Sequence, residues 1–221
     1  MIKMSNKREI LGDFYYRQAK REGFRSRSAL KLKEIAEKYS IVQKGNHIVD
    51  LGSAPGGWLQ VERDLAGDNG LVIGVDLSFI RPLPFDNVRI IKGDINDPKV
   101  VEEIVRLSGG PVDVVTSDLA PKFSGVHDFD HARQISLARA ALACASRVLR
   151  RGGRMVIKVL TGSEFADFQK ELARNFANVK IYKPKASRER SSETYIVCKG
   201  FTGERTAGTL KGAQDHDLDS V

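Results

Sequence analysis

The stretch that decides the fold is Asp50-Leu-Gly-Ser-Ala-Pro-Gly-Gly-Trp58. It follows the short apolar run His47-Ile-Val, which predicts a buried strand, and it precedes residues 59–65, which predict a helix. A glycine-rich turn between a strand and a helix is where an open α/β sheet binds a nucleotide-like ligand. Its glycines allow the backbone to approach a ligand at points where a Cβ atom would collide with it.

The spacing of these glycines narrows the class of ligand. The turn is not G-x-G-x-x-G, so it is a poor match to a dinucleotide site and argues against a nicotinamide oxidoreductase. It also lacks the Gly-Lys-[Ser/Thr] of a phosphate-binding P-loop. S-adenosyl-L-methionine carries an adenosine, a charged amino-acid tail and no phosphate, and we expect it as the cofactor. The first N–H groups of the following helix would face its carboxylate.

Strands and helices alternate along most of the chain. We expect strands at 47–51, 71–76, 88–92, 112–117, 153–160, 178–183 and 194–199, and helices at 6–22, 27–39, 57–66, 98–107, 131–149 and 164–175. Nearly all-apolar strands such as Leu71-Val-Ile-Gly-Val75 are typical of a parallel sheet with helices on both faces. Only residues 184–193 join the last two strands, too few for a helical crossover, so that pair should be antiparallel. The prediction is an α/β fold with a seven-stranded, mostly parallel sheet.

Composition places the chain among globular proteins. It has 221 residues, of which 41% are hydrophobic, and no apolar run approaches the ~20 residues of a membrane span. The N-terminus lacks the apolar segment of a secretory signal. The two cysteines, Cys144 and Cys198, lie in apolar surroundings and predict reduced thiols rather than a disulfide scaffold. We therefore expect a cytoplasmic protein.

The positive charge is concentrated at the N-terminus. The net charge is +8, and residues 1–33 hold ten basic and three acidic side chains, which gives +7 for this segment alone. Such a local excess is the electrostatic signature of a polyanion partner. Charge by itself does not separate RNA from DNA or from an acidic membrane, and a solvated basic helix face is the simpler alternative.

Carboxylates follow successive strands at the edge where ligands bind in such a sheet. Asp76 ends the second strand and could hold a ribose diol, Asp94 follows the third strand and could face an adenine amino group, and Asp118 follows the fourth. Any one of them could instead cap a helix or form a turn, and Trp58 could equally be a core residue. Four consecutive strand ends with suitable residues together predict a cofactor site.

A lysine interrupts the fifth strand. Lys158 lies inside the run Arg154-Met-Val-Ile-Lys-Val-Leu160, although lysine is rarely buried unless it is paired. Its side chain could reach solvent at the strand end, or it could be an amine placed among partners next to Asp118. Lys31 lies between leucines on the basic second helix and Glu193 begins the last strand. Each could be an ordinary surface charge, but together the four are two amines and two carboxylates from distant segments.

At this point the chain resembles the FtsJ-type RNA ribose 2′-O-methyltransferases, and most of all the ribosomal large-subunit branch, from about Phe14 to Lys199. The likeness rests on Ser26-Arg-Ser-Ala-Leu-Lys-Leu, the 50–58 turn, Ser117-Asp-Leu-Ala-Pro, Val156-Ile-Lys-Val and Ser192-Glu-Thr-Tyr-Ile-Val. It implies a Rossmann-like class I S-adenosylmethionine-dependent methyltransferase fold without a metal. It places a catalytic tetrad on Lys31, Asp118, Lys158 and Glu193. It places the cofactor contacts on Gly52, Gly56, Trp58, Asp76, Asp94 and Asp118. Residues 78–84 and the tail do not align.

The resemblance also implies domain limits. We expect a basic helical extension at 1–33 that is part of the same domain, a methyltransferase domain at 34–201 and a loose tail at 202–221.

The resemblance implies methylation of a ribose 2′-hydroxyl, of a uridine, in large-subunit ribosomal RNA within the ribosomal subunit, by a monomer. Lys158 would remove the hydroxyl proton as a neutral amine, or else orient the hydroxyl as an ammonium while water takes the proton. The segments 1–33 and 183–190 would contact phosphates. A transfer-RNA 2′-O-methyltransferase is the nearest alternative, because the segment Asp13-Phe-Tyr-Tyr-Arg-Gln-Ala-Lys-Arg also occurs in that branch. A non-catalytic RNA-binding protein is disfavoured by the complete tetrad.

Overall fold

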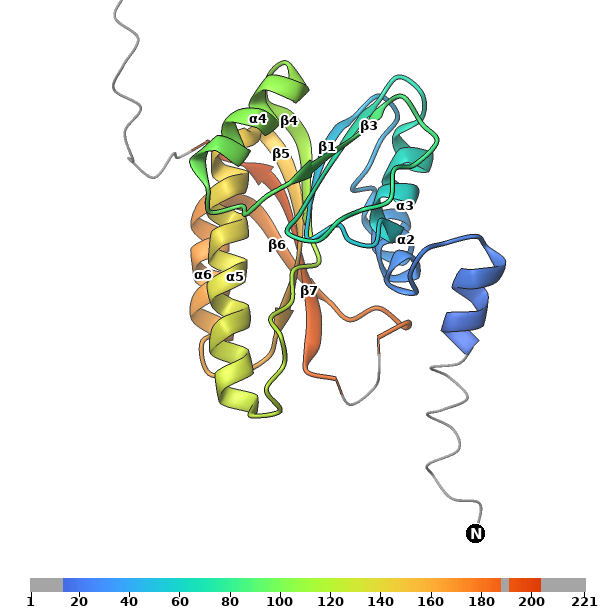
Figure 1. Ribbon diagram of the computed structural model, residues 1–221. Helices are drawn as coiled ribbons and strands as arrows, with labels where there is room; N and C mark the ends of the chain where they lie inside the picture. Colours follow the sequence, from blue (N-terminus) through green and yellow to red (C-terminus); the bar gives the residue numbers. More distant parts are fainter. Residues whose placement is uncertain (1–13, 188–190, 204–221) are drawn as a thin grey trace, which may run out of the picture.

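The structure, a computed structural model, describes residues 14–187 and 191–203, and it contains one seven-stranded sheet (Figure 1). The strands are β1 (His47–Leu51), β2 (Leu71–Asp76), β3 (Val88–Lys92), β4 (Val112–Ser117), β5 (Leu149–Leu160), β6 (Phe176–Tyr182) and β7 (Glu193–Phe201). The helices are α2 (Ser28–Tyr39), α3 (Gly57–Ala66), α4 (Pro98–Ser108), α5 (His127–Val148) and α6 (Phe165–Asn175). Residues 14–21 are also helical.

The strand order is β3-β2-β1-β4-β5-β7-β6. Every neighbouring pair is parallel except those of β7, which runs antiparallel to both β5 and β6. The short connection between the last two strands had predicted this, and the prediction is confirmed. Helices cover both faces, with α2 and α3 on one side and α4, α5 and α6 on the other (Figure 1). Each face buries its own hydrophobic cluster, which is the expected consequence of apolar strands between two helical layers.

Several predicted element bounds were wrong. β5 begins at Leu149 rather than 153, and α5 spans 127–148 rather than 131–149. The first turn of α5 is polar and carries Asp128 and Asp130, which suit a helix N-terminus but show no apolar period. The early part of β5 is exposed and joins the sheet beyond a register shift between Val112 and Val114. β6 and β7 also begin earlier than expected, at Phe176 and Glu193.

The N-terminal predictions are only partly within the described residues. Of the helix expected at 6–22, residues 14–21 are helical and 6–13 lie outside the described ranges, as do tail residues 204–221. The boundary expected between the N-terminal extension and the methyltransferase domain, at residues 33 and 34, falls inside α2. This helix packs on α3. Among the described residues no helix is both long and apolar enough to cross a membrane. Cys144 and Cys198 are free and buried, and burial raises the pKa of Cys144 to about 12.

Candidate active site

The predicted site residues gather at the edge where the parallel strands end, the lower edge in Figure 1. The register of β7 is what completes the group. Lys158 of β5 lies opposite Tyr195, and Leu160 lies opposite Glu193, so the start of the last strand arrives beside the end of the fifth. β4 ends in the same place, since Ser117 pairs with Ile157. Residues far apart in sequence therefore meet at one sheet edge.

The glycine-rich turn is shaped by contacts within the protein. Gly52 and Gly56 have φ values of 80° and 104°, a region that disfavours other residues. A Cβ atom at Gly52 would lie 2.9 Å from the side chain of Leu119, and one at Gly56 would lie 2.9 Å from Arg25 Nη1. The two glycines thus allow the segments that contain Arg25 and Leu119 to pack closely against the turn. They would also allow the backbone of the turn to approach a ligand.

Arg25 ties the N-terminal segment to this turn. Its guanidinium donates to the carbonyl oxygens of Pro55 at 3.2 Å and Pro82 at 2.8 Å, and also to that of Arg81. The backbone N–H of Arg25 donates to Gln60 Oε1 on α3 at 2.8 Å. The sequence suggested a phosphate-binding residue here, whereas the structure shows a side chain that holds two loops of the cofactor edge together.

Asp76 accepts hydrogen bonds from the loops that follow β1 and β2, and Asp94 accepts from the loop that follows β3. Asp76 Oδ2 accepts from the Ala54 N–H at 2.9 Å and Oδ1 accepts from the Ser78 N–H at 2.7 Å. Asp94 Oδ1 accepts from the backbone and side-chain nitrogens of Asn96, both at 2.9 Å. Each carboxylate keeps lone pairs for a ligand because two oxygens offer about four acceptor positions.

Trp58 is placed differently from its predicted ligand role. Its side chain is 2% exposed, its Nε1 donates to Ser28 O at 2.9 Å, and its ring lies 5.9 Å from that of Tyr195. The indole is therefore a core group. What Trp58 offers a ligand is its backbone N–H in the first turn of α3, where N–H groups have no partner within the helix.

The four residues of the predicted tetrad lie together as two ion pairs. Lys158 Nζ lies 3.1 Å from Asp118 Oδ1 and donates to the Asp118 carbonyl at 2.6 Å. Lys31 Nζ lies 2.5 Å from Glu193 Oε1. Lys158 is 6% exposed and Lys31 is 7% exposed, so the alternative of a lysine reaching out to solvent is wrong for both.

Tyr195 joins the two ion pairs, and the sequence had not singled it out. Its hydroxyl donates to Asp118 Oδ1 at 2.9 Å, and Lys31 Nζ lies 5.8 Å from its ring centroid. Burial raises the pKa of Tyr195 well above its usual value, and the charges of Asp118 and Glu193 add to this. Side chains alternate between the two faces of a sheet along a strand, so residues 193 and 195 of β7 lie on the same face. This alternation could have placed Tyr195 beside Glu193 from the sequence.

Glu193 is held in its charged form. Burial alone would raise its pKa, but the Lys31 ion pair, the charge of Lys158 and a hydrogen bond from Ser187 Oγ at 3.0 Å lower it overall. Each of the two carboxylates faces an amine. An arrangement of this kind can orient a hydroxyl and exchange a proton with it.

A second buried group of carboxyls lies beneath the turn. Asp50 and Glu62 are both 0% exposed, and Thr116 Oγ1 lies 3.1 Å from Asp50 Oδ1 and 2.6 Å from Glu62 Oε1. Burial raises the pKa of both carboxyls well above their usual values. The charges of Asp118 and Asp76 add to the rise for Asp50, and the charge of Asp50 adds to it for Glu62. Asp50 Oδ2, Glu62 Oε2 and Ser53 Oγ are buried without a hydrogen-bond partner.

Comparison with known proteins matches residues 24–201 to the model of the family described as FtsJ-like methyltransferase. A curated relative from Methanothrix thermoacetophila, named ribosomal RNA large subunit methyltransferase E, is 51% identical over 187 residues, 85% of this chain and 72% of the relative. One of the same name from Methanothermobacter thermautotrophicus is 46% identical over 192 residues, 87% of this chain and 91% of the relative.

Solved structures agree with the sequence comparison. A crystal structure described as a ribosomal RNA methyltransferase from Plasmodium falciparum has a TM-score of 0.73 and 30% identity, covering 81% of this chain and all of that one. The fibrillarin/Nop5p complex shares the fold, with a TM-score of 0.55 and 22% identity over 76% of this chain and 79% of that chain. With a family model matched over most of its length and relatives this similar, the chain belongs to the FtsJ-like methyltransferase family.

Proposed function

We propose that this protein transfers a methyl group from S-adenosyl-L-methionine to a ribose 2′-hydroxyl of large-subunit ribosomal RNA. The observation that carries the proposal is the pairing of buried Lys158 with Asp118 at the cofactor edge, next to the Lys31–Glu193 pair. The names of the curated relatives support large-subunit ribosomal RNA as the substrate class.

The residues of the edge fit the proposed cofactor. The first turn of α3 offers N–H groups to a carboxylate, Asp76 and Asp94 offer carboxylate oxygens to a nucleoside, and Ser53 Oγ is a buried polar atom without a partner. When bound, S-adenosylmethionine would supply an electrophilic methyl group. The thioether that is left behind is neutral and needs no acid to protonate it. The task left to the protein is therefore alignment and proton removal.

We assign the removal of the 2′-hydroxyl proton to Lys158. Its two contacts with Asp118 fix Nζ at the end of β5, and the hydroxyl of Tyr195 fixes Asp118 from the other side. The neutral amine would accept the 2′-hydroxyl proton as the new bond forms, and Glu193 and Lys31 would position the ribose. The alternative is an ammonium that only orients the hydroxyl while water removes the proton.

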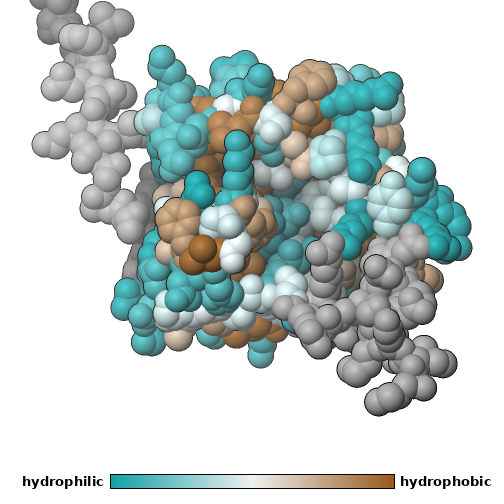
Figure 2. All heavy atoms as spheres, turned by 60° about the horizontal axis from the view of Figure 1, so that its bottom comes forward, coloured by the Kyte–Doolittle hydropathy of each residue, from teal (hydrophilic) through white to brown (hydrophobic). Residues whose placement is uncertain are grey.

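Exposed aromatic side chains border the acceptor side of the edge. Figure 2 brings this edge forward and shows apolar side chains gathered in patches among hydrophilic ones. In the segment that follows Asp118, Phe123 is 62% exposed and Phe129 is 54% exposed, with the Arg133 guanidinium 5.2 Å from the Phe129 ring. Aromatic and guanidinium planes are the surfaces on which unpaired RNA bases stack. This border suits a single-stranded RNA acceptor.

The decisive experiment offers the purified protein labelled S-adenosylmethionine together with unmethylated large ribosomal subunits or transfer RNA, and maps the products by mass spectrometry. We expect one 2′-O-methylated uridine in large-subunit RNA. Methylation of transfer RNA alone would establish the alternative, and cofactor binding without any transfer would indicate a binding protein. A monomeric state and a cytoplasmic location remain predictions.

The Lys158→Arg variant tests the proton assignment. Arginine keeps the positive charge but cannot accept a proton. We expect transfer to be lost while folding and cofactor binding persist. Near-normal turnover would show that the side chain at this position only orients the hydroxyl.

A further inference from the structure

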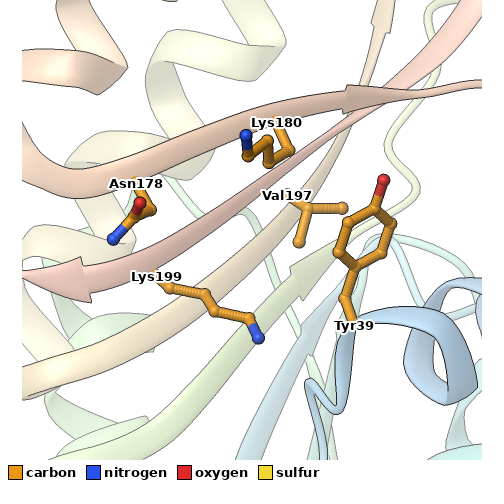
Figure 3. Close-up of a pocket in the computed structure, with 5 residues that line it drawn as sticks. All are labelled: Tyr39, Asn178, Lys180, Val197 and Lys199. Carbon is orange, nitrogen blue, oxygen red and sulfur yellow. The ribbon is translucent and has the colours of Figure 1, made fainter.

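A pocket of about 220 Å³ opens beside the last turn of α2, away from the site described above (Figure 3). Its lining comes from α2, β6 and β7 and consists of Tyr39, Asn178, Lys180, Val197 and Lys199. None of these residues has a part in the proposed chemistry. Two amines lie in this pocket without a carboxylate among its lining residues, a composition that suits an anion.

The strand register places this pocket on the same sheet face as the catalytic residues. Three rows of opposed residues cross β5, β7 and β6 in turn: Lys158–Tyr195–Tyr182, Val156–Val197–Lys180 and Arg154–Lys199–Asn178. Residues two apart in a strand point to the same face, and successive rows lie about 7 Å apart. Lys180 is therefore one row, and Lys199 two rows, from the row that holds Lys158.

The charge of the pocket is not neutralised by the protein. Lys180 is exposed and Lys199 is half-buried, and within the described ranges neither amine has a hydrogen bond or an ion pair. A third amine, Lys38 Nζ, lies 4.3 Å from the ring centroid of Tyr182 and 5.7 Å from that of Tyr39. The carboxylate nearby on α2, Glu34, already accepts from the Tyr182 hydroxyl and from the Lys185 N–H.

Amines interleaved with aromatic rings form the kind of surface that follows single-stranded nucleic acid. The two rings, Tyr39 and Tyr182, meet edge to face with centroids 5.5 Å apart, so the aromatic part of the surface is fixed in place. Lysine binds phosphate as a point charge and needs no further geometry. An acidic protein surface would also satisfy the charge, but the position one to two rows from the proposed target ribose favours the strand that carries that ribose.

We infer that this pocket binds a backbone phosphate of the acceptor RNA, a few nucleotides from the methylated ribose, through Lys180 and Lys199. The inference rests on the proposed function, because it takes the strand that enters the catalytic site as the ligand. It adds a contact surface on β6 and β7 to the basic N-terminal segment expected from the sequence.

The test is the double variant Lys180→Gln/Lys199→Gln, with Lys99→Gln/Lys170→Gln as the matched control. The control removes the same charge from exposed positions on α4 and α6, on the other face of the sheet. RNA affinity is measured over a series of salt concentrations with an unstructured fragment of large-subunit RNA. Each lost phosphate contact lowers the slope of log K against log salt by ~0.7, so the pocket variant, which loses one phosphate, should lose about 0.7 and the control none.

Equal slopes for the wild type, the pocket variant and the control would overturn the inference. So would normal binding of naked RNA with weakened binding of whole subunits, since that result would identify a protein partner. Methylation of unmethylated large ribosomal subunits by the wild type is measured separately. An active wild type with unchanged slopes refutes only the phosphate site, whereas an inactive wild type with intact cofactor binding refutes the proposed function.

Discussion

Two buried groups of charged side chains lie near the same sheet edge, and their chemistry is opposite. The first, the acceptor tetrad, consists of Lys31, Asp118, Lys158 and Glu193. The second, the carboxyl pair, consists of Asp50 and Glu62, with Thr116 between them. In the tetrad every carboxylate faces an amine, whereas in the pair two acids face each other across a hydroxyl.

The difference teaches that partners, rather than burial, decide the charge. Burial acts to raise the carboxyl pKa in both groups, yet the pKa of half-buried Glu193 is lowered, whereas the pKa values of fully buried Asp50 and Glu62 are raised. Thr116 has one hydroxyl proton and can donate it to only one carboxyl, so the other short contact needs a proton from an acid. In the tetrad each carboxylate is paired with an amine, whereas in the carboxyl pair burial favours the protonated, neutral form of the acids.

Removing the amine nearest the proposed reaction should have the largest effect. Lys158→Met should lower the single-turnover rate of RNA methylation by about 10²–10⁴-fold, the usual contribution of a positioned acid–base group. Glu62→Gln, which alters the carboxyl pair, should leave this rate close to that of the wild type. Equal losses in both variants would mean that the two groups act as one.

The second test breaks an ion pair and then removes both partners. Lys31→Met should cost about 3 kcal/mol of unfolding free energy, because it leaves the Glu193 charge buried without its partner. Lys31→Met/Glu193→Met should recover most of that stability and yet remain inactive.

Urea unfolding of the wild type, both single variants and the double variant measures the coupling. Lys33→Met provides the control, since the Lys33–Glu22 pair has side chains 44% and 27% exposed and should contribute no more than about 1 kcal/mol. A double variant as unstable as the single one would show that the tetrad is held by packing rather than by its charges.

Thr116→Val should have an intermediate effect on stability. It removes the hydroxyl between Asp50 and Glu62 and should cost about 1–3 kcal/mol, the usual penalty for unsatisfied buried groups. Thermal unfolding measures the loss. No change in stability would indicate that the two acids bond each other directly.

The pH dependence of stability provides a further test of the carboxyl pair. In the unfolded chain, Asp50 has a pKa of 3.8 and Glu62 a pKa of 4.5, so each loses its proton above that pH. In the folded protein both pKa values are raised, so the carboxyls keep their protons to higher pH. The unfolded state then binds fewer protons, so stability falls as pH rises through that window, by up to about 1.4 kcal/mol per unit for each group. Glu193 acts in reverse, and its contribution is lost only as pH falls below its unfolded value of 4.5.

Glu62→Gln should reduce the decline in stability as the pH rises above the unfolded value of 4.5, measured by urea unfolding at each pH. The same substitution should leave the acid limb, which reports Glu193, unchanged. A variant that declines as steeply as the wild type would mean that Glu62 is ionised in the folded protein.

The sequence predicted the sheet, its antiparallel strand and all four members of the tetrad. Alternating elements and a short connection are local signals that predict the sheet, and a lysine in an apolar strand singles out Lys158. The tetrad as a set came from the resemblance to the FtsJ-type family. Arg25, Glu62 and Tyr195 were not predicted in their observed roles. Each depends on a partner from a distant segment: a carbonyl of the 81–82 loop, a threonine of β4 and a carboxylate after β4. A polar residue on a helix predicts a surface position unless its partner is known.

The position of β7 between β5 and β6 has a consequence for the protein during its synthesis. When β6 has left the ribosome, about 20 residues remain to be made before β7 is complete, which takes about 1–4 seconds. Until then β5 presents an open edge that can pair with other chains. The same delay keeps Glu193 away from Lys31. The chain thus completes its tetrad and covers the open edge of β5 in a single late step.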